Sequence, residues 1–138
     1  MPVENIAVPI LDLQDAIWAP ERVIALYRKT QPRIHLINVQ PKYPSYVSRF
    51  FSKQYMARIH EEDGLQVLRP VVLELDKAGV PHWDHVLVGL KAERVAEFVK
   101  THYCSDVLMR DEPTTLLSSL RLGSVKSEIR RTLRAMYH

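Results

Sequence analysis

Short apolar segments alternate with longer amphipathic ones along the chain, and this alternation limits the folds that the chain can adopt. Strand-like runs lie at residues 5–11, 33–39, 80–88 and 106–109. Each is followed by a stretch in which apolar residues recur at helical spacing. Strands that alternate with helices form a parallel sheet with helices on both faces and right-handed crossovers. The pattern therefore predicts an α/β protein with an open parallel sheet.

The predicted helices differ in how clearly their ends are marked. Pro20 is interpreted as a first-turn proline of the first helix. The second helical stretch ends at Gly79, a natural residue for the position just after a helix. Gly64 and Pro70 interrupt this stretch, so we expect a kink or a break in it.

Length and composition exclude several classes of protein. The 138 residues correspond to one domain, residues 1–138. The longest apolar runs are only a few residues, whereas a membrane-spanning helix needs about 20, and the N-terminus carries no secretory signal pattern. The single cysteine, Cys104, excludes an internal disulfide. We therefore expect a cytoplasmic protein without membrane contact, in which Cys104 is a buried or half-buried structural thiol.

Glycine is scarce, and the four glycines are far apart. They are Gly64, Gly79, Gly89 and Gly123, and no two lie within nine residues of each other. Loops that cradle phosphate need clustered glycines, because the backbone must approach the anion closely and often at positive φ. The sequence therefore excludes a P-loop and a glycine-rich dinucleotide motif.

Six segments, in the same order and with similar spacing, resemble the universal stress protein family over nearly the whole chain. They are Ile6-Ala-Val-Pro-Ile10, residues 33–39, Ala78-Gly79-Val80, Val88-Gly89 with the helix start that follows, Asp106-Val-Leu-Met109, and Leu120-Arg-Leu-Gly123-Ser124-Val125. Lys91 stands where the family usually has proline. The resemblance implies a Rossmann-like sheet of the adenine nucleotide alpha hydrolase type, with four recognisable strands in the order 3-2-1-4.

The resemblance also implies where the phosphates of a nucleotide would bind. Family members that bind ATP carry glycine, two residues, glycine, nine residues, then glycine and serine or threonine. Counted back from Gly123-Ser124, the first two glycines fall on Arg110 and Pro113, so both are lost. Pro113 has no amide hydrogen, and Arg110 adds bulk where the backbone should approach a ligand. Gly123, Ser124 and Val125 still offer backbone amides and a hydroxyl at a helix N-terminus, which favours an anion.

The adenosine end of the implied site is altered as well. The family's aspartate falls on Leu11, and Asp12 follows one position later. Because one position in a strand turns a side chain to the opposite face, Asp12 replaces that carboxylate only if the strand has already ended. The lining positions carried over from the family are Pro9, Val39 and Met109, and packing in the core or at a strand end is an equal alternative for these three.

The resemblance implies a regulatory or interaction module in stress response, and the two lost glycines indicate that it does not bind ATP efficiently. The alternative is a member that binds ATP or AMP, with magnesium, through Gly123-Ser124 and a rearranged loop. No catalytic residue is predicted, so we expect no enzyme, although slow nucleotide hydrolysis stays open. No cofactor is firmly predicted.

A metal site at the third predicted strand is the less favoured interpretation of its polar residues. His82 and Asp84 share one face of the strand, whereas His85 points away. No further cysteine or histidine is placed near them, so a solvated edge strand is favoured and no metal is predicted.

Residues 42–58 combine four basic and five aromatic residues and contain no acidic residue. Such a mixture suits single-stranded nucleic acid, because aromatic rings stack on bases and cations bind phosphates. The other interpretation is an amphipathic helix that buries the aromatic rings against the sheet or a second subunit. We favour this second interpretation, because three acidic residues follow at positions 61–63. A nucleic-acid partner is therefore not expected.

The predicted fourth strand lies at an edge of the sheet. Members of the family usually continue into a fifth strand that pairs across a dimer, whereas this sequence ends at His138. An uncovered edge strand is prone to aggregation. We therefore expect a homodimer in which another surface covers this edge, with an unknown protein partner as a further expectation.

Overall fold

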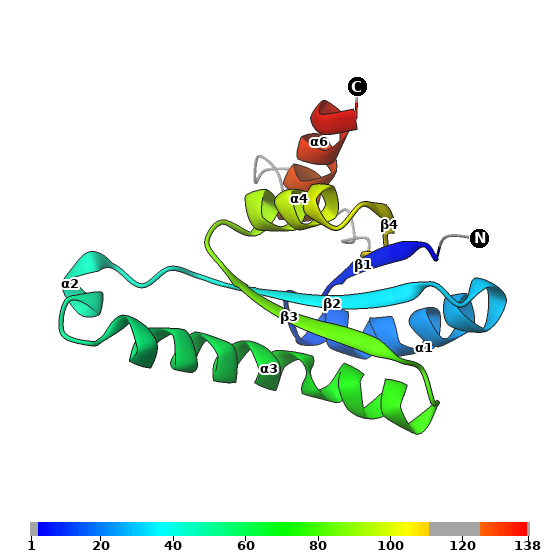
Figure 1. Ribbon diagram of the computed structural model, residues 1–138, viewed down its shortest axis with the longest axis horizontal. Coiled ribbons are helices and arrows are strands. Elements are labelled where there is room, and N and C mark those ends of the chain that lie inside the picture. The colour runs from blue at the N-terminus through cyan, green and yellow to red at the C-terminus, as the bar shows by residue number, and fades with distance from the viewer. Residues whose placement is uncertain (1–2, 111–124, 138) are drawn as a thin grey trace, which may run out of the picture.

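The computed structural model describes residues 3–110 and 125–137. Strands and helices alternate along these residues (Figure 1). The elements are β1 (Asn5–Pro9), α1 (Leu13–Thr30), β2 (Arg33–Gln40), α2 (Ser45–Ser48), α3 (Lys53–Lys77), β3 (His82–Val88), α4 (Lys91–Thr101), β4 (Cys104–Val107) and α6 (Val125–Tyr137). The strands form one sheet in the order β3-β2-β1-β4, and all neighbours are parallel. The predicted fold class and strand order are confirmed.

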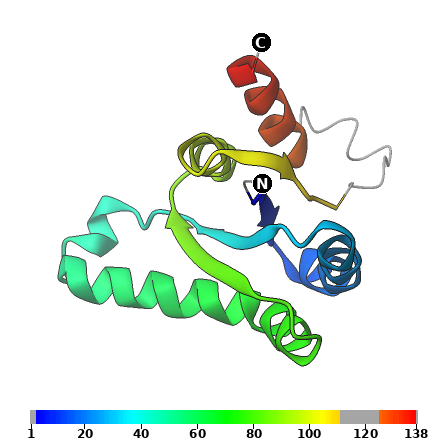
Figure 2. The same cartoon turned by 45° about the vertical axis from the view of Figure 1, so that its right-hand side comes forward.

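Helices cover both faces of the sheet (Figures 1 and 2). α1 and α3 lie on one face, and α4 and α6 lie on the other. Neighbouring strand residues point to opposite faces. Val8 and Leu36 therefore join an apolar cluster with α1 and α3, whereas Ala7 and Ile37 join a second cluster with α4 and α6. No helix of the described part is long and apolar enough to cross a membrane.

α1 begins at Leu13, so the interpretation of Pro20 as a first-turn residue is wrong. Asp12 precedes the helix, and its side chain accepts a hydrogen bond from the N–H of Asp15. Such a cap satisfies one of the free N–H groups of the first turn. The cap starts the helix well before Pro20, which lies inside it.

α3 runs without a break through Gly64 and Pro70. Gly64 is buried and faces β3, and a Cβ atom at this position would collide with the side chain of Val86. The glycine therefore allows α3 to lie close to the sheet. Gly79 follows the helix with a φ of 71°, a conformation that favours glycine, as predicted.

β4 begins two residues earlier than predicted, at Cys104, and ends at Val107. Cys104 pairs with Asn5, and Asp106 pairs with the next residue of β1. Ser105 is therefore an extra residue, which forms a bulge that a sequence pattern does not reveal.

On the side of β4 that faces away from β1, a backbone N–H is bonded to a side chain of the same strand. The N–H of Leu108 donates to the carbonyl of Ala7 in β1 at 2.8 Å. Because alternate residues of a parallel strand bond to the same neighbour, the N–H of Val107 points away from β1. It donates instead to Oδ1 of Asp106 at 2.8 Å.

The favoured interpretation of segment 42–58 had its aromatic rings buried against the sheet or a second subunit, and the first of these two arrangements is not found. Four of them are exposed, namely Tyr46, Phe50, Phe51 and Tyr55. α2 and the start of α3 extend past the end of the sheet in both views (Figures 1 and 2). The sheet therefore offers these rings no surface to cover them.

Candidate functional site

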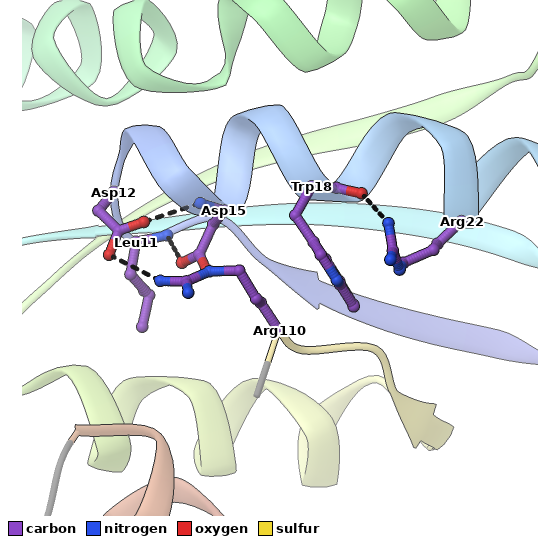
Figure 3. A network of polar contacts seen from close by, with 6 residues as sticks. All are labelled: Leu11, Asp12, Asp15, Trp18, Arg22 and Arg110. Atoms are coloured by element: carbon purple, nitrogen blue, oxygen red, sulfur yellow. Dashed lines mark hydrogen bonds and ion pairs between the residues drawn. The ribbon is translucent and has the colours of Figure 1, made fainter. Parts of the chain in front are cut away.

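Polar groups meet where β1 ends and α1 begins (Figure 3). The strand ends at Pro9, before Asp12. Oδ1 of Asp12 accepts the N–H of Asp15 at 2.8 Å, and Oδ2 of Asp15 accepts the N–H of Leu11 at 2.9 Å. These reciprocal bonds resemble a capping box. The positive end of the helix dipole favours both carboxylates at this position.

Arg110 follows β4 and reaches across to these carboxylates (Figure 3). Its Nε donates to Oδ1 of Asp15 at 3.2 Å, and its Nη2 lies 3.8 Å from Oδ2 of Asp12. The side chain of Asp15 is only 1% exposed. A buried carboxylate needs a compensating partner, and Arg110 supplies a positive charge. We refer to Asp12, Asp15 and Arg110 as the Arg110 clamp.

β2 holds the segment after β1 beside the clamp. The N–H of Ile10 donates to the carbonyl of Ile37 at 2.8 Å. Nδ2 of the buried Asn38 donates to the carbonyl of Ile10 at 2.9 Å, and Nε2 of Gln40 donates to Oδ1 of Asn38 at 2.6 Å. The backbone that leads into the clamp is therefore fixed on both sides of Ile10.

The residues carried over for the adenosine end lie partly in the core. Pro9 and Val39 are buried, and Leu11 and Met109 are partly buried against the apolar cluster of α4 and α6. Asp12 follows the end of the strand, which meets the condition for it to replace the family's aspartate. Its carboxylate, however, is already held in the clamp.

The residues predicted for the phosphate end are described only in part. Arg110 lies in the clamp, and Val125 is the first residue of α6. Pro113, Gly123 and Ser124 lie outside the described residues. The structure therefore brings together Leu11, Asp12 and Arg110 from the predicted set.

Sequence reasoning missed Asp15 and Asn38. The spacing Asp12-x-x-Asp15 is close to a capping-box pattern and offered a signal for the helix start. The contact between Arg110 and Asp15 joins positions 95 residues apart, so no local pattern indicates it. Asn38 looks like any polar residue near the end of a buried strand.

A group of histidines lies under α4. Nδ1 of His35 is 3.0 Å from Nε2 of His85, and Nε2 of His35 is 2.9 Å from Oδ1 of Asn5. The ring of His102 stacks on Phe98 with 3.8 Å between the ring centroids. Burial, together with the neighbouring groups His85, His102 and Arg33, lowers the pKa of His35 to about 4. His35 therefore stays neutral at neutral pH.

His82 lies on the other face of β3 and contacts two carboxylates. Its Nδ1 is 2.7 Å from Asp84, and its Nε2 is 2.8 Å from Asp76. Burial disfavours its charged form, but the two carboxylates outweigh this effect and raise its pKa. Within residues 3–110 and 125–137, no group of three or more potential ligands is arranged to hold a metal ion.

A scan against models of protein families finds no match, and a search of curated proteins finds none either. Solved structures share the fold. Hypothetical protein MJ0577, the subject of a structure-based assignment of biochemical function, matches with a TM-score of 0.70 and 19% identity, covering 95% of this chain and 90% of that one. A universal stress protein in complex with cAMP matches with a TM-score of 0.64 and 16% identity, covering 96% and 91%.

The universal stress protein from Archaeoglobus fulgidus in complex with dAMP matches with a TM-score of 0.60 and 13% identity, covering 95% of this chain and 92% of that one. These likenesses extend over nearly the whole length of both chains. The chain therefore has the fold of the universal stress proteins, as the sequence resemblance implied.

Proposed function

We propose that this chain is a regulatory or interaction module in stress response that does not bind ATP efficiently. The Arg110 clamp is the observation that carries this proposal. In open α/β sheets, ligands bind beyond the carboxyl ends of the strands. At the carboxyl end of β1, this position holds an arginine and two carboxylates that already bind one another. The fold shared with universal stress proteins supports the link to stress response.

The clamp opposes a nucleotide in three ways. The guanidinium of Arg110 is held by carboxylates and is not free to bind a phosphate. A nucleotide that displaced Arg110 would leave the carboxylate of Asp15 buried without this cation. Loss of the cation beside a buried carboxylate is unfavourable even though the N–H of Leu11 still donates to it. The side chain of Asp12 is half-exposed and would also repel phosphate.

A second candidate function is adenine nucleotide binding. Two structures that share the fold are complexes with cAMP and dAMP, which favours this candidate. Asp12 lies beyond the end of β1, as a replacement for the family's aspartate requires. ATP or AMP, with magnesium, would then bind through Gly123-Ser124 after the clamp had opened.

Calorimetric titration with ATP and AMP, each with magnesium, separates the two candidates. We expect wild-type protein to show no saturable binding at about 1 mM nucleotide and no rise in its thermal midpoint. The double substitution Arg110→Gly with Pro113→Gly removes the clamp and restores both glycines implied by the family pattern. We expect it to bind ATP at least about tenfold more tightly than wild type.

Arg22→Ala is the matched control. Arg22 lies on α1, donates to the carbonyl of Trp18 at 3.0 Å and packs on the ring of that residue (Figure 3). This variant loses an arginine near the clamp without changing the clamp, so it should behave as wild type. Saturable ATP binding by wild type at physiological concentration would contradict the first candidate and select the second.

A further inference from the structure

A pocket of about 550 Å³ lies between the segment after β2, α2 and the start of α3. Three cations line it, Lys42, Arg49 and Lys53, together with the aromatic rings of Tyr43 and Phe51 and the ring of His60. None of the clamp residues lines this pocket. Its volume is in the range of pockets that hold small organic ligands. We refer to it as the His60 pocket.

His60, which lines this pocket, carries a buried polar atom with no partner among the described residues. The residue is only 8% exposed, and its Nδ1 has no hydrogen-bond partner in the described part of the chain. The ring lies against Tyr43, with 4.7 Å between ring centroids. A buried nitrogen without a partner is unfavourable for the folded protein. A ligand that forms a hydrogen bond with this nitrogen would remove that cost.

Exposed aromatic rings continue from the pocket over α2 and the start of α3. Phe50 is 72% exposed and Tyr46 is 64% exposed. Phe51 stacks on Tyr55 with 5.2 Å between centroids, and Arg49 lies over the ring of Phe50 at 5.2 Å. A concentrated apolar patch of this kind marks an interaction surface.

The charged residues that line the pocket are all basic. Lys42, Arg49, Lys53 and Arg58 form no ion pair with any residue that the structure describes. The acidic residues at positions 61–63 do not line the pocket. Among the described residues, the lining of the pocket therefore carries cations and no carboxylate. The N-terminus of α3, capped by Ser52, adds a positive dipole end.

We propose that the His60 pocket and the exposed rings beside it bind single-stranded nucleic acid, with one nucleotide in the pocket and further bases on the rings. Aromatic platforms bind bases of any sequence, and cations follow the phosphates. A nucleotide has a planar base that would stack on Phe51 and a phosphate that the cations would bind. The edge of its base would form a hydrogen bond with Nδ1 of His60. An apolar protein segment would leave the unpaired cations without partners.

Fluorescence anisotropy with a labelled oligouridine of about 12 nucleotides tests this proposal. We expect saturable binding that weakens with salt, with a slope of about −2 in log K against log salt if three cations contact phosphates. Arg49→Gln should make that slope about 0.7 shallower. A duplex of the same length should bind at least about tenfold more weakly, because its bases are already stacked.

Phe50→Ala should weaken binding by about 5- to 140-fold, which corresponds to the loss of about 1–3 kcal/mol for one stacked base. Tyr103→Ala and Lys100→Gln are matched controls, because both side chains are exposed and neither lines the pocket. Both variants should bind as wild type. Equal losses in Phe50→Ala and Tyr103→Ala would overturn the proposal, as would the absence of binding at about 0.1 mM protein.

His60→Phe separates binding from folding. Phenylalanine keeps the ring beside Tyr43 but lacks Nδ1, so the thermal midpoint should stay the same or rise, while oligouridine binding weakens about tenfold. A lower midpoint with unchanged binding would assign His60 a purely structural role and overturn the proposal. Uridine monophosphate is the free-nucleotide probe, and an affinity equal to that of the oligomer would overturn the polynucleotide assignment. The protein could instead dimerise without binding oligouridine. If Phe50→Ala abolished that dimerisation, the surface would be assigned to a second copy of the chain.

Discussion

Arg110 joins the end of the sheet to the first turn of α1 through one planar side chain. Its guanidinium contacts both Asp12 and Asp15. Arginine suits this task because its donors lie in a rigid fork and its charge is permanent. A lysine at this position would present a single point of charge. The residue that the family pattern marks as a lost glycine is thus also the residue that compensates a buried carboxylate.

His35 makes the stability of the protein depend on pH. Burial, with His85, His102 and Arg33 adding to it, lowers the pKa of His35 to about 4. Between the ordinary histidine pKa of about 6.5 and pH 4, the unfolded chain binds more protons at this residue than the folded chain. The stabilising contribution of neutral His35 is therefore lost as pH falls through this window, up to about 3 kcal/mol. Urea unfolding at several pH values measures this loss.

In the variant His35→Gln, the free energy of unfolding should change less with pH between 6.5 and 4.5, since glutamine does not titrate. His82 is a control of opposite sign, because Asp76 and Asp84 raise its pKa despite its burial. Its contribution is present at low pH and is lost as pH rises through the raised value. His82→Gln should therefore lower stability mainly on the acid side. If the free energy of unfolding of His35→Gln fell with decreasing pH as steeply as that of wild type, the prediction would be contradicted.

At the scale of elements, α3 lies close to β3 because residue 64 has no side chain. Gly64→Ala improves helix propensity by about 1 kcal/mol. The added Cβ would collide with the side chain of Val86, and overpacking typically costs about 1–3 kcal/mol. Valine has few alternative rotamers, so the collision is not easily relieved. We expect a net loss of about 1 kcal/mol in the free energy of unfolding, measured with urea.

The double variant with Val86→Ala shows whether this contact is the cause. Truncation of Val86 removes the atoms that Gly64→Ala would meet. The double variant should be more stable than the sum of the two single losses predicts, by about 1 kcal/mol. Strictly additive losses would place the cause elsewhere.

The alternation of elements could be predicted from the sequence because it depends on local patterns, whereas the strand order followed from the resemblance to the universal stress proteins. Predictions failed where a second signal competed with the first. Pro20 indicated a helix start, but the Asp12 cap begins α1 earlier. Gly64 and Pro70 indicated a kink or a break; α3 has no break, and close packing on Val86 explains the glycine.

The candidate site could be predicted only in part for a different reason. The bulk of Arg110 in the implied phosphate loop follows from the sequence, but its partner Asp15 lies 95 positions away. The contact between His35 and His85 likewise joins two strands 50 positions apart. Contacts of this kind arise from tertiary structure, and a single sequence contains no local pattern for them.

At the scale of the whole molecule, the sheet separates two apolar clusters. Cys104 belongs to the cluster of α4 and α6 and is 8% exposed. Burial raises the pKa of its thiol to about 11. The thiolate is the reactive form. We therefore expect a disulfide reagent at pH 8 to label Cys104 at least about 100-fold more slowly in the folded than in the unfolded protein.

Two core variants test whether the two sides of the sheet open separately. Leu133→Ala weakens the contact of α6 with the cluster that contains Cys104 and should accelerate labelling. Val23→Ala removes buried atoms from the other cluster, so it should lower global stability with a smaller effect on labelling at low denaturant. Equal acceleration in both variants would show that the two sides open together.

The carboxylate of Asp106 already occupies the outward N–H of Val107 at the edge of β4. A foreign strand that docked there would have to displace a hydrogen bond to a charged acceptor and bring its own carbonyl oxygen beside that negative charge. Each copy of the protein thus carries a barrier to ribbon-like polymerisation at the place where one sheet would otherwise template the next. The barrier matters most in concentrated solution, and neutralising the carboxyl group of Asp106 would weaken it by removing the charge.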